Sequence, residues 1–353
     1  MHPTNFRLIL SMGLVAVCIL ALPCLAPAVA QDYGAEPTTW SEVSEAVYAF
    51  MEQEKFVEAL ALMEKAALAL EDREFEVSDL KMTILFDAGR TDEALNVWEK
   101  GLEKGFFYFV IPRSTTYDSV RKNDRFRKTL ARNNRLREEA NIGSKPEYKV
   151  ITPESYSPDG SYPLMMIIHG GNQSIVKALD RWDPRVIGDG LIIAYIQSSM
   201  QAATKSYRWD LGGVDIYSPP TAQEEVFGLY REIVEEYSVD TTQVTLAGFS
   251  QGGNLSLFMA AEGTIPAKGF IAGCPATRSP IPLEIAQAAA ERGVRGTIFV
   301  GAEDWTAAAV QTTVVNFTEA GLSVDHIVME DKGHEYPDNF DEVLREAVEY
   351  IYQ

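Results

Sequence analysis

The chain has 353 residues, of which 46% are hydrophobic and 23% are charged, and its formal net charge is −20. This length is sufficient for two domains, and the composition is ordinary for a globular protein. The acidic balance excludes nucleic acid and anionic membrane surfaces as expected partners, because both repel a negatively charged chain.

Residues 1–30 have the pattern of a secretory signal peptide. Arg7 gives a positive start, residues 8–22 form an apolar run too short for a comfortable membrane span, and Ala28–Ala30 offers a cleavage site. We therefore expect an exported protein, periplasmic or secreted, that keeps no membrane span after cleavage and begins with a short segment at 31–39. An uncleaved membrane anchor is the alternative.

Signal cleavage would leave a single cysteine. Cys18 and Cys24 lie in the signal segment, so only Cys274 remains and no intrachain disulfide can form. Cys274 ends an apolar run, which favours a small buried residue over a reactive thiol.

Helical periodicity covers residues 40–138. Glu58-Ala-Leu60 recurs as Glu93-Ala-Leu95, an offset of 35 residues, and repeats of about 34 residues are typical of tetratricopeptide units built from paired helices. The segment resembles that family, with about two units and a degenerate third near residues 124–130. A plain helical bundle is the alternative. Such helices carry apolar stripes and are a possible docking site for a protein partner.

Residues 139–147 look like a linker, and after it the pattern changes to alternating strands and helices over residues 148–353. Continuous apolar strands alternating with helices predict an α/β fold, a doubly wound and mainly parallel sheet with helices on both faces. The expected strands are 148–152, 164–169, 191–197, 244–249, 269–274, 297–300 and 326–330, and the expected helices are 175–182, 222–237, 252–262, 282–291, 306–320 and 339–352.

Gly248-Phe-Ser-Gln-Gly252 follows one of these strands and precedes a helix. This is the setting of a G-x-S-x-G nucleophile elbow, in which a tight turn exposes a strained serine and glycines permit the close approach of strand and helix. Ser250 is therefore the candidate nucleophile, and an ordinary glycine-rich turn is the alternative.

A serine hydroxyl needs a base to remove its proton, and only three histidines follow the signal segment. His169 ends a strand before two glycines, and His326 lies within a strand. His334 lies on a loop after the last strand, where a base could reach the elbow, so we assign it that role.

The third member should be an acid after a strand between Ser250 and His334. Glu303 and Asp304 both occupy such a loop, and the spacing from Gly301 favours Asp304 without excluding Glu303. Asp325 is a weaker candidate.

Oxyanion donors are expected from two places. One is the backbone N–H of Gln251 at the start of the helix, and the other is the loop containing Gly171 and Asn172. His169 then has a structural role. Tyr207 and Trp209 lie at the same end of the sheet, where they could line a pocket or only pack the loop.

Ile168-His-Gly-Gly171, Gly248-Phe-Ser-Gln-Gly252, Gly301-Ala-Glu-Asp304 and Gly333-His334 together resemble the motifs of the α/β-hydrolase fold. The similarity is to phospholipase/carboxylesterase and dienelactone-hydrolase-like esterases. It implies hydrolysis of a small-molecule carboxylic ester, or a related acyl compound, without a metal or cofactor. The alternatives are an exopeptidase or amidase of the same fold, and a non-catalytic helical-repeat interaction protein with a vestigial hydrolase domain.

Overall fold

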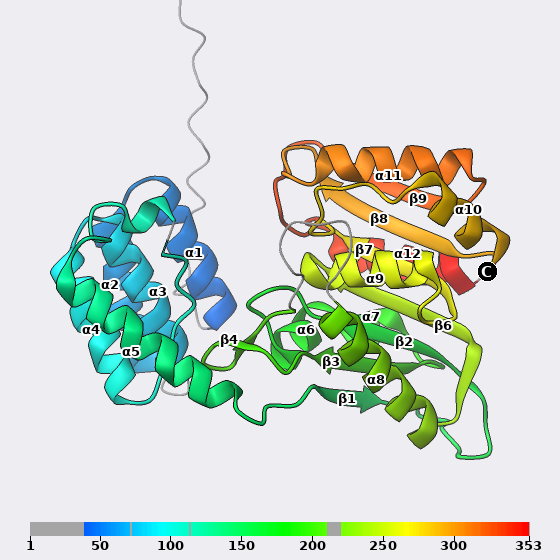
Figure 1. Cartoon of the computed structure of the whole chain (residues 1–353), viewed down its shortest axis with the longest axis horizontal. Helices are drawn as coiled ribbons and strands as arrows, with labels where there is room; N and C mark the ends of the chain where they lie inside the picture. The colour runs from blue at the N-terminus through cyan, green and yellow to red at the C-terminus, as the bar shows by residue number, and fades with distance from the viewer. Residues whose placement is uncertain (1–38, 71–72, 113, 210–219, 353) are drawn as a thin grey trace, which may run out of the picture.

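The computed structural model describes residues 39–70, 73–112, 114–209 and 220–352. The signal segment and most of the 31–39 segment expected from the sequence lie outside these residues. The described chain forms an all-helical part followed by a part built around a central sheet (Figure 1). None of the described helices is long and apolar enough to span a membrane.

The described residues of the helical part include five α-helices and a short 3-10 helix, and the sequence specifies where several of them begin. Thr39 and Glu42 form a reciprocal capping box at the first helix, and the Asn123 side chain accepts N–H bonds at the start of the last. Successive α-helices pack against each other, and the 3-10 helix packs against the third α-helix. They are α1 (Trp40–Glu52), α2 (Phe56–Ala69), α3 (Glu74–Asp87), α4 (Thr91–Glu103), η2 (Thr115–Tyr117) and α5 (Asp124–Asn141).

Asn133 links the segment between α4 and α5 to the helical core through hydrogen bonds. Its fully buried Oδ1 accepts hydrogen bonds from Trp98 Nε1 at 3.0 Å and from the Tyr108 N–H at 2.8 Å, and its Nδ2 donates to the Tyr108 carbonyl. A buried amide that uses both donor and acceptor groups holds its neighbours in one arrangement. The extended segment after α4 is thereby fixed against α5.

The central sheet has seven strands in the order β1-β3-β2-β6-β7-β8-β9. β1 is antiparallel to β3, and all other neighbours are parallel. This mostly parallel topology is of the α/β-hydrolase type, as the sequence predicts. The strands are β1 (Glu147–Ile151), β2 (Tyr162–Ile168), β3 (Ile192–Gln197), β6 (Val239–Phe249), β7 (Ala267–Gly273), β8 (Arg295–Gly301) and β9 (Ser323–Met329).

Helices cover both faces of the sheet because its central strands are apolar on both sides. Alternate residues of β2 enter two separate cores: Met166 packs with α8 to α11, and Met165 packs with α6, α7 and α12. The helices are α6 (Ile175–Arg181), α7 (Pro184–Ile187), α8 (Pro220–Glu236), α9 (Gln251–Glu262), α10 (Leu283–Glu291), α11 (Ala307–Glu319) and α12 (Phe340–Tyr352).

The structure contains three elements that sequence patterns did not predict. α7 is a single turn, and the hairpin β4 (Gln201–Ala203) and β5 (Ser206–Tyr207) follows β3. The hairpin lies between the two parts of the molecule, where Ala203 joins the buried core of the helical part (Figure 1). In addition, α5 continues to Asn141, so the start of the segment expected to be a linker is helical.

Candidate active site

Ser250 stands at the turn between β6 and α9 with φ 56° and ψ −116°. Residues other than glycine rarely adopt these backbone angles, and here the surrounding structure enforces them. A Cβ on Gly252 would lie 1.9 Å from the Ile168 carbonyl oxygen, and a Cβ on Gly248 would lie 2.5 Å from the same atom. Glycine is therefore required on both sides of the serine, because the end of the neighbouring strand β2 lies too close for any other residue.

Three side chains from separate loops form a hydrogen-bonded chain at this turn. His334 Nε2 lies 2.9 Å from Ser250 Oγ, and His334 Nδ1 lies 2.8 Å from Asp304 Oδ2. His334 follows β9 and Asp304 follows β8, so the carboxyl ends of parallel strands bring the three together. With Nδ1–H donating to the carboxylate, Nε2 carries the lone pair that can accept the serine proton.

The Asp304 side chain is completely buried. Its Oδ1 accepts the Thr306 N–H at 2.9 Å, which leaves Oδ2 for His334. The two other candidate acids are exposed to solvent: Glu303 in the same loop, and Asp325 within β9. Asp304 is thus the carboxylate that contacts the histidine.

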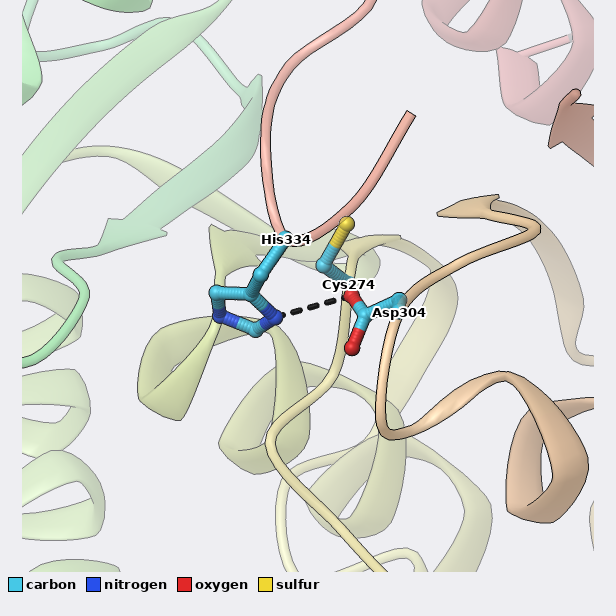
Figure 2. A group of neighbouring side chains, drawn as sticks. All are labelled: Cys274, Asp304 and His334. Atoms are coloured by element: carbon cyan, nitrogen blue, oxygen red, sulfur yellow. Dashed lines mark hydrogen bonds and ion pairs between the residues drawn. The ribbon is translucent and has the colours of Figure 1, made fainter. Parts of the chain in front are cut away.

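Cys274 lies beside this pair, after the end of β7 (Figure 2). It is fully buried, and burial raises the pKa of its thiol to about 12. Its Sγ donates to the Glu335 carbonyl at 3.4 Å, next to His334 in the chain. Ligand atoms of Cys274, Asp304 and His334 lie within 4.8 Å of one another, as metal ligands can. A metal held there would compete with His334 for the Asp304 carboxylate, whose Oδ2 lies 2.8 Å from His334 Nδ1.

The two expected sources of oxyanion donors face each other. A Cβ on Gly171 would lie 3.0 Å from Gln251 Oε1, which places this loop against the start of α9. Gln251 is the first residue of the helix, where backbone N–H groups lack intrahelical acceptors. Asn172 has φ 58°, a left-handed conformation that turns the loop after β2. An anion beside Ser250 Oγ would meet the positive end of α9.

His169 orders this loop. It is almost fully buried, its Nε2 accepts the Ser198 N–H at 3.2 Å, and its Nδ1 lies 2.6 Å from the Gly170 carbonyl oxygen. These contacts specify the neutral tautomer with hydrogen on Nδ1. Burial lowers the pKa of His169 to about 4, so the ring stays uncharged near neutral pH.

Trp209 is a packing residue, and this answers one question that the sequence left open. It is fully buried, stacks on His169 at a centroid distance of 5.0 Å and donates from Nε1 to the His169 carbonyl. Its backbone N–H donates to Gln251 Oε1 at 3.0 Å. Tyr207 exchanges two backbone hydrogen bonds with Gln173, so the hairpin supports the loop before α6.

Aromatic rings surround His334. Phe249 lies 5.2 Å from it between centroids, and Trp305, which is half exposed, stacks on it at 5.8 Å. Sequence patterns did not identify Phe249 as a neighbour of the histidine, because that contact joins residues far apart in the chain. His326 lies in β9, opposite Ile298, and burial lowers its pKa.

Comparison with known proteins gives structural similarities only. No family model and no curated protein sequence matches this chain. An uncharacterized protein from Bacillus cereus ATCC 10987 is similar at 21% identity and a TM-score of 0.47, covering 89% of this chain and 98% of its own. Esterase PE8 has 14% identity and a TM-score of 0.47, covering 59% of this chain and 99% of its own. A carboxylesterase from Bacillus cereus has 13% identity and a TM-score of 0.45, covering 61% and 98%.

Proposed function

We propose that this protein is a serine hydrolase that cleaves carboxylic esters through Ser250. The observation that carries the proposal is the hydrogen-bonded chain from Ser250 Oγ through His334 to the buried Asp304 carboxylate. The strained serine conformation at a helix N-terminus supports it, because such strain persists where a function requires the exposed position.

In the proposed reaction Ser250 Oγ attacks the ester carbonyl while His334 Nε2 takes its proton. The Gln251 N–H and the Gly171–Asn172 loop hold the oxyanion, and Asp304 stabilises the imidazolium. The tetrahedral intermediate expels the alcohol, which receives its proton from His334 and leaves an acyl-enzyme. Water, deprotonated by His334, then attacks the acyl carbon and releases the acid and free Ser250.

Active-site labelling tests the assignment. A fluorophosphonate probe should modify the wild-type protein and fail to modify Ser250→Ala. Ser238→Ala is the matched control, because Ser238 directly precedes β6 and Ser250 directly follows it. Labelling that persists in Ser250→Ala, or that Ser238→Ala also abolishes, would refute Ser250 as the nucleophile.

The proposal commits to esters, and the alternative is an amidase or exopeptidase with the same residues. A panel of p-nitrophenyl esters and aminoacyl p-nitroanilides separates the two. Preference for the anilides in kcat/KM would replace esterase by peptidase or amidase.

We also propose that the protein is exported after cleavage at residue 30, and that the helices are tetratricopeptide-like. The 35-residue sequence offset, which relates α2 to α4, supports the second proposal. N-terminal sequencing of the protein recovered from outside the cytoplasm tests the first: a start at Gln31 is expected.

A further inference from the structure

A cavity of about 420 Å³ opens where the helical part meets the loop after β3. One wall comes from α5 and the segment before it, and the other comes from the residues leading into and out of the β4–β5 hairpin. The lining residues are Phe109, Arg137, Glu138, Asn141, Ser199, Met200, Gln201, Ala202 and Arg208. We refer to this cavity as the junction cleft.

The junction cleft is held open by hydrogen bonds that join the two parts. Asn141 exchanges bonds with the backbone of Gln201, at 2.8 Å to its N–H and 3.0 Å to its carbonyl. The Phe107 N–H donates to Thr204 Oγ1 at 2.9 Å. These contacts fix the cleft walls relative to each other, so the cavity is preformed.

The cleft adjoins the candidate active site along the chain. Arg208 lines the cleft, and each of its neighbours contacts the active-site loops: Tyr207 pairs with Gln173, and the Trp209 N–H donates to Gln251 Oε1. Along the chain, Arg208 is therefore flanked on both sides by residues that contact the segments holding the proposed oxyanion donors.

The cleft lining holds two arginines, Arg137 and Arg208, and one carboxylate, Glu138, so its balance is positive and favours an anion although the whole chain is strongly acidic. Arg208 Nε is buried and has no hydrogen-bond partner among the described residues. Among the residues that the structure describes, neither Arg137 nor Arg208 has a carboxylate within ion-pair distance. A buried guanidinium N–H without an acceptor costs free energy that a bound carboxylate would recover. The Phe109 ring lies 5.8 Å from the Arg208 guanidinium and provides an apolar wall beside it.

We propose that the junction cleft binds a carboxylate group of the substrate, so that the preferred substrate is an ester carrying a negative charge. This inference rests on the proposed function. It also assigns the helical part a role, because α5 and Phe109 complete the binding site.

Selectivity between matched esters tests the proposal. One pair, 4-carboxyphenyl butyrate and 4-carbamoylphenyl butyrate, places the charge on the alcohol. The other pair, mono-(4-nitrophenyl) adipate and 4-nitrophenyl hexanoate, places it on the acyl group. In at least one pair the wild-type kcat/KM should be higher for the anionic ester than for the neutral ester. Arg208→Gln should reduce this anionic-to-neutral ratio of kcat/KM about tenfold or more.

Arg135→Gln is the charge-matched control, since Arg135 is exposed on the same helix as Arg137 and does not line the cleft. It should leave the ratio unchanged. Absence of an anionic preference in both wild-type pairs would overturn the proposal. An equal fall in Arg135→Gln and Arg208→Gln would also overturn it, because a general change in net charge would then explain the effect.

Calorimetry on Ser250→Ala separates failure of this inference from failure of the proposed function. Tighter binding of 4-carboxyphenyl butyrate than of its carbamoyl analogue, lost on adding Arg208→Gln, supports the cleft even if the wild type hydrolyses neither ester. Ser250-dependent hydrolysis with no difference in binding or rate within either pair leaves the function standing and refutes the cleft.

Discussion

Replacing Asp304 by asparagine tests the proposed mechanism most directly, because the substitution preserves shape and changes one interaction. Asn Oδ1 would keep the Thr306 N–H, which Asp304 Oδ1 now accepts at 2.9 Å. Asn Nδ2 would then face His334 Nδ1, now 2.8 Å from Oδ2. A donor in that position forces Nδ1 to accept, so the hydrogen moves to Nε2 and the ring can no longer take the proton of Ser250.

The wrong tautomer and the lost carboxylate charge should lower kcat by about 10³- to 10⁴-fold, as such substitutions do in serine hydrolases. This corresponds to about 4–5.5 kcal/mol of transition-state stabilisation. Steady-state hydrolysis of p-nitrophenyl butyrate measures the loss, and circular dichroism with thermal melting verifies that the variant is folded.

Glu303→Gln is the matched control, because it removes the neighbouring carboxylate from an exposed position in the same loop. It should retain kcat within about twofold, as expected for a surface charge away from the reacting groups. A folded Asp304→Asn protein with more than a tenth of wild-type kcat would contradict the reasoning. So would an equal loss in Glu303→Gln.

The fold itself supports three more predictions. Gly252→Ala should destabilise the protein by about 3 kcal/mol or more in urea unfolding, since its Cβ would meet the Ile168 carbonyl oxygen at 1.9 Å. Gly228→Ala, in α8 with open space around it, should instead stabilise by up to about 1 kcal/mol, and equal effects would refute the steric argument. Because burial lowers the pKa of His169 to about 4, its NMR ring signals should stay constant from pH 8 to pH 5. The stability that its neutral ring contributes is complete above the unfolded pKa of about 6.5 and is lost as pH falls toward 4; a titration midpoint near 6.5 would contradict this. Cys274 should resist iodoacetamide at pH 8 and react fully after unfolding, because its pKa is raised to about 12; rapid labelling of the native protein would show an accessible thiolate.

Sequence patterns predicted the seven strands of the main sheet because the central strands, such as β2 and β3, are apolar runs between turn residues, whereas the edge strands β1 and β9 mix exposed and partly buried positions. The elbow could be located because its glycines are required locally: Gly248 and Gly252 both lie against the end of β2. The grouping of Ser250, Asp304 and His334 followed from topology, since all three lie after parallel strands of one sheet.

The hairpin and its contacts could not be predicted from the sequence. β4 and β5 are short, and their stability comes from partners distant in the chain, such as Phe107 for Thr204. The role of Trp209 was undecidable for the same reason, because its burial depends on stacking against His169. Periodicity reports which face of an element is apolar, and it does not report what covers that face.

The hydrogen bonds between the helical part and the β4–β5 hairpin also bear on how the protein can be divided. Asn141 and Phe107 hold the hairpin from one side, and the hairpin pairs with Gln173 on the other. Removing the helices would therefore expose Ala203 to water and free the hairpin to move, and the loops beside Ser250 would lose their support. A truncated protein with low activity would report this loss of order, together with loss of the junction cleft, rather than missing catalytic groups. Unfolding of the helical part and of the carboxyl end of the sheet should accordingly be coupled, so that a ligand in the junction cleft protects both from proteolysis.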